Sequence, residues 1–411
     1  MSEKNTGSDS MQEMAGTSGF TEKNEEAEAP AASVGIITFH AAYNFGSALQ
    51  AYALQEAVKR AGCAPKIINY RMKAQKRYYA LLRPWYGPRT FAKDVMQVSV
   101  LRERSVRRKR FEDFMKRYMR LTDEFADPNE TSRFANRFDC VISGSDQIWN
   151  SHACELENQP FAYMFPYLLC GVTKPKFSYA SSIVNMKDSE LARLCPYLRR
   201  FRFLSVRERS SCGRLQKATG MKVANVLDPT LLFSGDEWRK MMRIQTRQEK
   251  SGIVFYTLGG YNTVAQMKPL LMELAESMKE RVTVLTPNCC VMWKKGEPFE
   301  NHPEFGPVEF LNALENAKLV VTDSYHGTIL SADLNRPFYS VVYGGASDFR
   351  KTDLLETLGL SGRVIRGGAS VRALPQETID FGPVNQALEL LRKNSWNYLK
   401  QSIKECVAND V

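Results

Sequence analysis

Short apolar runs alternate with helical patterns along most of this chain, and that alternation limits the folds open to it. The first run, Val34–Phe39, leads through a polar loop into a helical pattern that reaches about Arg60 and ends at Gly62. A second run at Lys66–Tyr70 completes a β-α-β unit. Because such units place parallel strands side by side with helices across their faces, the pattern predicts an α/β protein.

The same alternation continues to the end of the chain. Further strands are expected at Phe138–Ser143, Lys176–Ser181, Phe203–Val206, Val223–Leu227, Gly252–Leu258, Arg281–Thr286, Lys318–Asp323 and Phe338–Val342. Helices are expected at Ala265–Glu280, Glu309–Ala317, Tyr325–Leu334 and about Gly382–Cys406. A chain of 411 residues with two such sets of units predicts two α/β domains with a cleft between them.

Composition suggests where these domains begin and end. Residues 1–33 are rich in Ser, Thr, Gly, Glu and Ala, and we expect them to form a disordered acidic tail. An N-terminal domain is expected at 34–200, a C-terminal domain at 201–382 and a closing helix at 383–411. The domain limit falls near residues 185–205.

Positive charge is concentrated in a basic insert at residues 71–120. This segment carries 16 Lys/Arg against 4 Asp/Glu, which accounts for the net charge of +11. A solvated helix face explains such a segment, and an anionic membrane surface or a phosphorylated acceptor is the alternative. Nucleic acid is the least expected partner, because the aromatic residues of the insert are not spaced like a base-stacking platform.

Several classes of protein do not fit this sequence. It contains no run of 18 or more apolar residues and begins without the apolar core of a secretion signal. Nine cysteines, an odd number, lie without metal-ligand spacing, which favours reduced thiols over disulfides or a structural zinc site. We therefore expect a cytoplasmic protein without a metal, with the basic insert as a point of peripheral contact with the inner face of a membrane.

A reactive-looking histidine follows the strand expected at Lys318–Asp323. The sequence runs from that strand into Asp-Ser-x-His-Gly-Thr and then into a helical pattern. Ligands bind at the carboxyl ends of strands in open α/β sheets, so His326 is expected in a binding crevice. The positive end of the following helix disfavours imidazolium and attracts an anion, which suits proton exchange near neutral pH. The alternative is that Ser324 only caps the helix while His326 packs against the sheet.

Four motifs resemble those of the polysaccharide pyruvyl transferase family. They are Tyr43–Gln50, Gly144–Asn150, Ser205–Ser210 and Asp323–Thr328. Their order and spacing extend the resemblance from residue 34 to about 345. It implies two Rossmann-like domains in a GT-B-like arrangement with the active site in the inter-domain cleft. It also implies transfer of a pyruvyl group from phosphoenolpyruvate to a sugar, forming a ketal on a cell-surface or capsular glycan during exopolysaccharide biosynthesis.

The resemblance gives roles to particular residues on the donor side. His326 matches the family's catalytic histidine, and Arg207, followed by Glu208, matches its donor-binding arginine. Characterised members carry Arg-Leu-His where this chain has Ser324–His326, so one donor cation has to come from Arg209 or elsewhere. A buried ion pair in the neighbourhood of Glu208 is the alternative role for Arg207.

The implied chemistry needs one acid/base group and several anion-binding groups. Protonation of the enolpyruvyl methylene leaves oxocarbenium character at the carbon that bears the phosphate. A sugar hydroxyl adds there, phosphate leaves, and a second hydroxyl closes the ketal. His326 would be the acid/base and Arg207 the anion clamp. Ser324 and the backbone N–H groups of Gly327 and Thr328 would cradle the phosphate. The scheme requires phosphoenolpyruvate as co-substrate and no metal or cofactor.

The two N-terminal motifs would serve the acceptor sugar or lipid-linked glycan. The residues expected there are Asn44, Gly46, Ser47, Asp146, Gln147 and Trp149. Glycine lets the backbone approach a ligand closely, although the same residues could simply start a helix. Asp146 and Gln147 could bind sugar hydroxyls, and Trp149 could stack on a sugar or anchor its loop in the core. Asp228–Thr230 is expected to set a turn, a structural role.

Two other functions remain open at this point. An ordinary GT-B glycosyltransferase with a nucleotide-sugar donor would share the architecture, although no carboxylate is evidently placed to hold a ribose. A non-catalytic paralogue could keep the cleft for glycan recognition alone. Binding of a nucleoside diphosphate favours the first, and an unchanged glycan after replacement of His326 by alanine favours the second.

Overall fold

The computed structural model of the chain describes residues 31–83, 87, 95, 98–287, 291–375 and 377–408. The expected acidic tail lies, up to residue 30, outside the described residues, as does most of 84–97 within the basic insert. From Ala32 onward the chain forms one compact unit. None of the helices in the described ranges is both long enough and apolar enough to cross a membrane.

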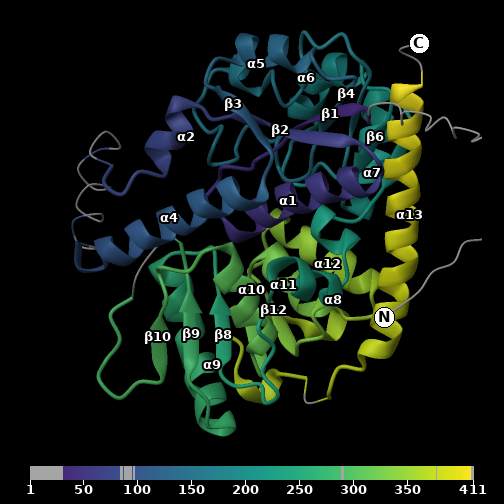
Figure 1. Cartoon of the computed structure of the whole chain (residues 1–411). Helices are drawn as coiled ribbons and strands as arrows, with labels where there is room; N and C mark the ends of the chain where they lie inside the picture. Colours follow the sequence, from purple (N-terminus) through teal and green to yellow (C-terminus); the bar gives the residue numbers. More distant parts are fainter. Residues whose placement is uncertain are drawn as a thin grey trace, which may run out of the picture. The chain divides into compact units, whose positions relative to one another are not determined.

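The N-terminal part of this unit contains a parallel sheet with the strand order β3-β2-β1-β4-β5 (Figure 1). Its strands are β1 (Ser33–Ile37), β2 (Ala64–Tyr70), β3 (Leu121–Phe125), β4 (Cys140–Ser143) and β5 (Lys176–Ser178). A parallel pair, β6 (Leu204–Val206) and β7 (Val223–Asn225), continues this sheet. Single bridges from Phe177 to Phe203 and from Ser181 to Val206 join β6 to the β5 edge.

The C-terminal part contains a second parallel sheet with the order β10-β9-β8-β11-β12-β13. Its strands are β8 (Ile253–Tyr256), β9 (Val282–Leu285), β10 (Phe299–Asn301), β11 (Leu319–Thr322), β12 (Phe338–Val342) and β13 (Val364–Arg366). Two parallel sheets connected through helices confirm the predicted α/β class. The change of sheet lies between Asn225 and Ile253, C-terminal to the expected limit near residues 185–205, while the domain limits themselves stay a prediction.

Helices occupy the connections between most strands. The α-helices are α1 (Phe45–Arg60), α2 (Lys73–Tyr78), α4 (Leu101–Tyr118), α5 (Pro128–Ala135), α6 (Asp188–Leu198), α7 (Arg209–Thr219), α8 (Gly235–Met242), α9 (Tyr261–Met278), α10 (Pro307–Asn316), α11 (Tyr325–Asp333), α12 (Phe349–Thr357) and α13 (Phe381–Val407). Short 3₁₀ turns are η2 (Val98–Val100), η3 (Phe161–Met164), η4 (Pro229–Leu232), η5 (Ala346–Asp348), η6 (Ser361–Arg363) and η7 (Val371–Ala373).

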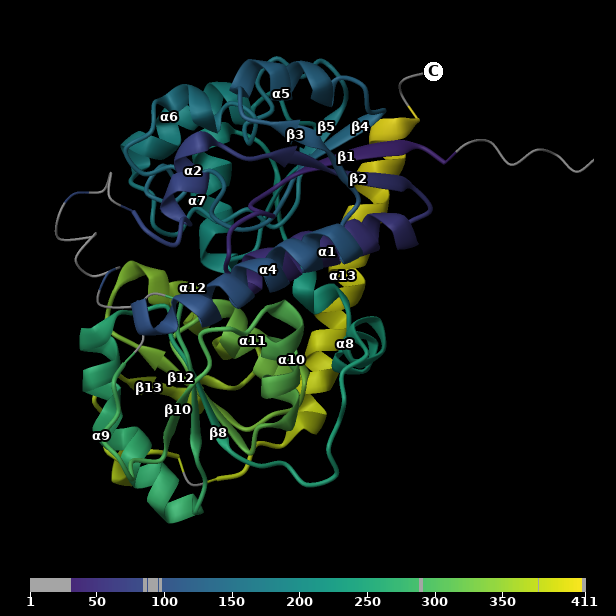
Figure 2. The same ribbon diagram turned by 60° about the vertical axis from the view of Figure 1, so that its left-hand side comes forward.

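The basic insert ends in α4, which packs against both α1 and α10 (Figure 2). Its sequence places Phe111, Phe114 and Met115 at helical spacing, and all three side chains are buried. Most of its basic side chains lie on the remaining, exposed face. The insert is therefore part of the packed unit, and it reaches elements of both sheets.

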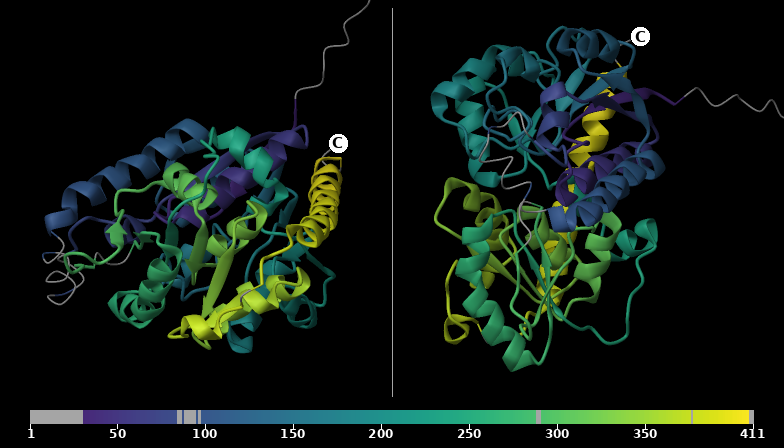
Figure 3. Two further views of the ribbon diagram at one scale, coloured as in Figure 1. Left: turned by 90° about the horizontal axis from the view of Figure 1, so that it is seen from below. Right: turned by 90° about the vertical axis from the view of Figure 1, so that its left-hand side faces the viewer.

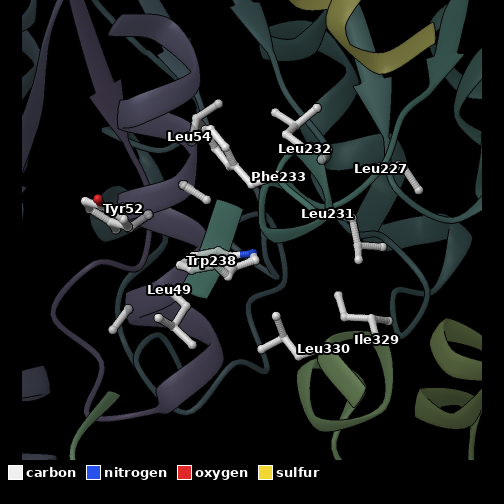
Figure 4. Packing of buried hydrophobic residues seen from close by; sticks show 14 of the residues in the cluster. Leu49, Tyr52, Leu54, Leu227, Leu231, Leu232, Phe233, Trp238, Ile329 and Leu330 are labelled. Atoms are coloured by element: carbon white, nitrogen blue, oxygen red, sulfur yellow. The ribbon is translucent and has the colours of Figure 1, made fainter. Parts of the chain in front are cut away.

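A hydrophobic cluster joins the two sheets through α1 (Figure 4). Leu49 and Leu54 of α1 pack in one cluster with Phe233 beyond η4, Trp238 of α8 and Leu330 of α11. The last helix, α13, drawn in yellow in Figure 3, contacts both β4 and α11. The helices α1 and α13 therefore each connect elements of the first sheet with elements of the second.

Candidate active site

His326 lies in the first turn of α11, directly after the buried strand β11. The helix begins after Ser324, which caps it: the Ser324 Oγ accepts a hydrogen bond from the N–H of Gly327 at 3.4 Å. The imidazole is 8% exposed. The histidine is thus held by backbone geometry at the carboxyl end of a central strand.

Asp228 supplies a carboxylate beside that imidazole. Its Oδ2 lies 3.5 Å from Nε2 of His326, an ion-pair distance longer than a hydrogen bond. The other oxygen, Oδ1, accepts hydrogen bonds from the N–H and hydroxyl of Thr230 at 3.0 and 2.8 Å. Ser145 also donates to Oδ2, at 3.0 Å. The turn predicted at Asp228 is present, and its carboxylate also faces the histidine, a role that the local pattern did not predict.

Asp228 is kept ionised by its neighbours. Burial raises the pKa of its carboxyl group, but the opposing interactions with His326 and with Arg207 hold that pKa well below its usual range. A charged carboxylate at this place stabilises positive charge on the imidazole. The pair is therefore suited to accepting and returning a proton at Nε2.

Arg207 is buried within a group of carboxylates. Its Nε lies 2.9 Å from Glu208, its Nη1 lies 2.9 Å from Asp228, and its Nη2 lies 3.9 Å from Asp146. The guanidinium stands over the ring of Tyr325 at 4.2 Å from the centroid. The structure thus contains the buried ion pair that the sequence left open as the alternative role for Arg207.

This environment changes what Arg207 can do for a donor. Two of its three guanidinium nitrogens are occupied by carboxylates, while Nη2 has no hydrogen-bond partner within the described residues. Only that nitrogen remains for an anion. Its charge is already balanced, so its clearest role here is to position Asp228.

The expected phosphate cradle at the start of α11 is already engaged within the helix. The N–H of Gly327 donates to the Ser324 hydroxyl, and the N–H of Thr328 donates to the Ser324 carbonyl at 3.0 Å. The Thr328 hydroxyl bonds the same carbonyl, also at 3.0 Å. All three residues are buried. Ser324 acts as a cap, and these two amides are not available to a phosphate.

Trp149 is a core anchor and offers no face to a sugar. Its side chain is fully buried, at 0% exposure. The indole N–H is shared between the Ser143 hydroxyl and the Tyr167 carbonyl, at 3.2 and 3.3 Å. Of the two roles that the sequence allowed for this residue, the structure supports packing under the loop.

The other expected acceptor residues lie at the start of α1 and in the loop that follows β4. Asn44 caps α1, and the Ser47 hydroxyl donates to Asp146 at 2.8 Å. Asp146 adopts a left-handed backbone conformation with φ of 78°, which is unusual for a residue with a side chain and typical of functional turns. Gln147 accepts a hydrogen bond from Asn150 at 2.9 Å. Their contact with an acceptor stays a prediction.

Gly46 is required by its closeness to the histidine. A Cβ atom built on Gly46 would lie 2.0 Å from Nδ1 of His326. Glycine therefore lets the start of α1 press against the imidazole and fix one side of it. The close approach predicted for this position is present, but the observed partner is His326.

We expect Gly46→Ala to displace His326 and to destabilise the fold by about 1–3 kcal/mol, as overpacking does in tightly packed interiors. The rate of turnover should fall by more than the loss of stability explains, because the imidazole of His326 would move away from Asp228. Urea unfolding and steady-state kinetics measure the two effects. Gly213→Ala is the matched control, since a Cβ there meets nothing within 4 Å and its activity should stay at the wild-type level.

Arg350 is a cation of this site that the motifs did not reveal. It lies in the first turn of α12 and is partly exposed. Burial lowers the pKa of its guanidinium, as does the charge of Arg207, while Glu208 and Asp146 raise it. Arg350 and Arg207 also line one pocket, so the two guanidinium groups are near each other. The helix α12, which contacts α11, thus carries a cation near Arg207.

Several solved structures are similar to this chain at low sequence identity. The UDP-GlcNAc 2-epimerase of Methanocaldococcus jannaschii, in complex with UDP-GlcNAc and UDP, has a TM-score of 0.50 and 11% identity, over 91% of this chain and 99% of that one. The Neisseria meningitidis UDP-GlcNAc 2-epimerase has a TM-score of 0.49 and 9% identity, over 91% of this chain and 99% of that one. The glycosyltransferase SnogD from Streptomyces nogalater has a TM-score of 0.44 and 12% identity, over 92% of this chain and 100% of that one. The M. jannaschii match supports the predicted GT-B-like arrangement of two Rossmann-like domains.

Sequence comparison gives the family. No protein among the curated sequences matches the chain. The family model of polysaccharide pyruvyl transferases matches residues 44–345, a span that contains α1, Arg207 and the histidine motif. Because that match covers well over half of its length, this chain belongs to the polysaccharide pyruvyl transferase family.

Proposed function

We propose that this protein transfers a pyruvyl group from phosphoenolpyruvate to two hydroxyls of a sugar in a cell-surface or capsular glycan, in the cytoplasm. The observation that carries the proposal is the pairing of His326 with a buried, ionised Asp228. Ketal formation needs one group that both gives and takes a proton. This pair is such a group, at the carboxyl end of a central strand.

The reaction follows from the position of His326 Nε2, which has no hydrogen-bond partner within the described residues. The protonated imidazole gives its proton to the methylene of phosphoenolpyruvate, and the carbon bearing the phosphate becomes electron-deficient. A sugar hydroxyl adds to that carbon and returns a proton to the imidazole. Phosphate leaves with the electron pair of its bond to carbon, and the second hydroxyl closes the ketal as its proton passes to the departing phosphate. Asp228 stabilises the cationic imidazole between these steps.

Arg350 supplies the donor cation in this proposal. Its charge is balanced less directly than that of Arg207, and it is partly exposed. We place the donor's anionic groups between Arg350 and Nη2 of Arg207. Glu208 and Asp228 hold the guanidinium of Arg207 in position. The scheme has phosphoenolpyruvate as co-substrate and involves no metal or cofactor.

Ligand-induced thermal stabilisation tests the donor. Phosphoenolpyruvate at about 100 times its dissociation constant should add roughly 2.7 kcal/mol to the free energy of unfolding. The shift should vanish in Arg350→Gln and persist in Arg366→Gln, an exposed arginine at the end of β13. A shift with UDP or GDP alone would point to glycosyl transfer, and no shift with any of the three would favour a non-catalytic glycan-binding protein.

Peripheral contact with an anionic membrane through α4 is a second part of the proposal. Arg107 is buried and Arg110 pairs with Glu309 at 3.2 Å, so neither is available to lipid. Lys109, Lys116 and Arg117 are exposed, and the ion pair of Lys109 with Asp113 lies on the same exposed face of α4. These three define the candidate membrane surface.

Replacing Lys109, Lys116 and Arg117 together by glutamine should weaken binding to phosphatidylserine vesicles, since each basic residue near such a surface contributes about 1 kcal/mol. Vesicle sedimentation at low and high salt measures this. Replacing Lys217, Lys222 and Lys240, which are also exposed, removes the same charge elsewhere and should change little. Equal losses in both triple variants would leave only a general charge effect.

A further inference from the structure

Lys351 lies at the centre of a buried network next to the candidate active site. It follows Arg350 in α12, and its side chain is 3% exposed. The ammonium group donates hydrogen bonds to the carbonyl oxygens of Asp323 and Val341, at 2.8 and 2.6 Å, and pairs with Oδ1 of Asp348 at 3.1 Å. A lysine ammonium has three hydrogens, and these three acceptors engage all of them. None is left for a ligand.

The acceptor at Asp323 connects the network to the histidine. Asp323 directly follows β11, and His326 comes three residues later. The Asp323 carboxylate accepts hydrogen bonds from the Thr257 hydroxyl at 2.5 Å and from the Leu258 N–H at 2.9 Å, just after β8. Its backbone carbonyl is the one that Lys351 binds. The loops that follow β8 and β11 are thus joined to each other and to this lysine.

The carboxylate of Asp348 connects the network to Arg350. Asp348 is the last residue of η5, two residues before Arg350. While its Oδ1 pairs with Lys351, its Oδ2 accepts hydrogen bonds from the backbone N–H groups of residues 343–345, at 2.8, 2.9 and 3.2 Å. Those residues directly follow β12. One carboxylate therefore joins the loop after β12 to the lysine and to the start of α12.

The three strands joined in this way are neighbours in the second sheet, in the order β8-β11-β12. Ligands bind at the carboxyl ends of strands in open parallel sheets, which is where the network lies. His326 comes three residues after one acceptor of Lys351, and Arg350 comes two residues after another. The separation of the imidazole from the Arg350 guanidinium therefore depends on the position of one ammonium group.

The charge of Lys351 is held firmly in this place. Burial lowers the pKa of its ammonium group, while Asp348 and Asp323 oppose that shift. Displacing the ammonium would leave two backbone carbonyls without a hydrogen-bond donor and break a buried ion pair, and each of these changes carries a free-energy cost. The lysine thus fixes the three loops to one another.

We propose that Lys351 is a positioning residue for the donor: it sets the place of Arg350 relative to His326, and so the place where phosphoenolpyruvate is held for protonation. The inference rests on the proposed function, because it concerns the cation to which that proposal assigns the donor. Lys351 touches neither the substrate nor the reacting atoms. It acts through the backbone at Asp323 and through the carboxylate of Asp348.

Lys351→Met tests this role, with Lys176→Met as the matched control. Methionine is also an unbranched side chain, but it has no hydrogens to donate. Lys176 is likewise buried, and its ammonium donates to the carbonyls of Leu169 and Val172 at 2.9 and 2.7 Å. It is the first residue of β5, at the amino end of a strand in the other sheet. Both variants lose a buried ammonium, but only one loses it beside the candidate site.

We expect the dissociation constant of phosphoenolpyruvate to rise roughly tenfold or more in Lys351→Met, because the donor cation is displaced. Isothermal titration calorimetry below the unfolding temperature measures it. Asp348→Asn breaks the same ion pair and should weaken binding similarly. The double variant should bind no more weakly than the weaker single variant, because the two side chains act as a unit. Lys176→Met should bind as the wild type does, which separates positioning from a general loss of stability.

Hydrogen exchange gives a second readout that does not require the donor. Exchange at the amides of residues 343–345 should be faster in Lys351→Met and unchanged in Lys176→Met, since Asp348 loses the ammonium that holds it. Unchanged exchange together with unchanged affinity for phosphoenolpyruvate would refute the positioning role and leave the proposed function standing. An equal loss of affinity in Lys176→Met would refute it as well.

Failure of the proposed function gives a different result. In that case the wild type binds no phosphoenolpyruvate, and pyruvyl transfer is refuted. Faster exchange at residues 343–345 in Lys351→Met alone would still support Lys351 as the residue that positions Arg350.

Discussion

Replacement of His326 by glutamine is expected to lower phosphoenolpyruvate-dependent pyruvyl transfer by roughly 10²–10⁴-fold, the usual contribution of a positioned acid/base group. Glutamine fills similar space between Gly46 and Asp228 but cannot exchange a proton at neutral pH. Thermal unfolding should therefore change little while kcat collapses. Single-turnover measurements with saturating phosphoenolpyruvate separate this loss from a loss of binding.

His152→Gln is the matched control for that experiment. His152 is 61% exposed and its imidazole contacts Glu190, away from the site. Its replacement removes an imidazole of the same kind and should leave kcat at the wild-type level. Retained turnover in His326→Gln, with phosphoenolpyruvate still bound, would move the acid/base role to another group and undo the proposed mechanism.

The parts of this fold that could be predicted from sequence are its regular β-α units. The strands that the sequence revealed are apolar runs that lead into a helix, such as β8 and β11, which are buried along their whole length. The strands that it did not reveal, β3, β10 and β13, lie at sheet edges and have only one fully buried residue each. Edge strands need no continuous apolar run, so hydrophobic periodicity gives a weak signal for them.

The site was predictable only where it is local. His326 could be placed because a strand, a cap and a helix start follow one another within a few residues. Asp228 and Arg350 lie near His326 because distant elements pack together. The residues next to them in sequence do not predict that role. Asp228 lies three residues after β7 and caps the turn η4, and an ordinary turn produces the same pattern, so its sequence position did not point to the histidine.

For Trp149 the sequence left two roles open that only tertiary packing could separate. A tryptophan in a polar loop suits a sugar-stacking role or a core role equally well in sequence. What separates the two is whether the ring faces solvent, and that depends on Tyr167 and Phe201 in other segments, which enclose it. Local patterns therefore located the functional loops, while tertiary packing decided which side chains in them are free to bind.

Replacement of Arg207 by methionine is expected to destabilise the protein by about 3–5 kcal/mol, the cost of leaving buried charges without their partner. The side chains of Glu208 and Asp228 are 1% and 0% exposed, and both depend on this guanidinium. Urea unfolding at neutral pH measures the change. Arg363→Met is the matched control, since the side chain of that arginine is not buried and the residue ends η6, just before β13.

The pH dependence of that loss identifies its cause. The folded-state pKa of Asp228 lies below the unfolded value of about 3.9, so its contribution to stability is present above that pH and is lost as the pH falls. In Arg207→Met that contribution is reduced at neutral pH, so the difference in stability from the wild type should shrink below about pH 4. A variant that keeps wild-type stability at every pH, yet loses affinity for phosphoenolpyruvate, would instead establish Arg207 as the donor clamp that the family resemblance implies. Loss of stability with phosphoenolpyruvate affinity retained at low temperature would assign Arg207 to positioning Asp228, and leave Arg350 as the cation that meets the donor.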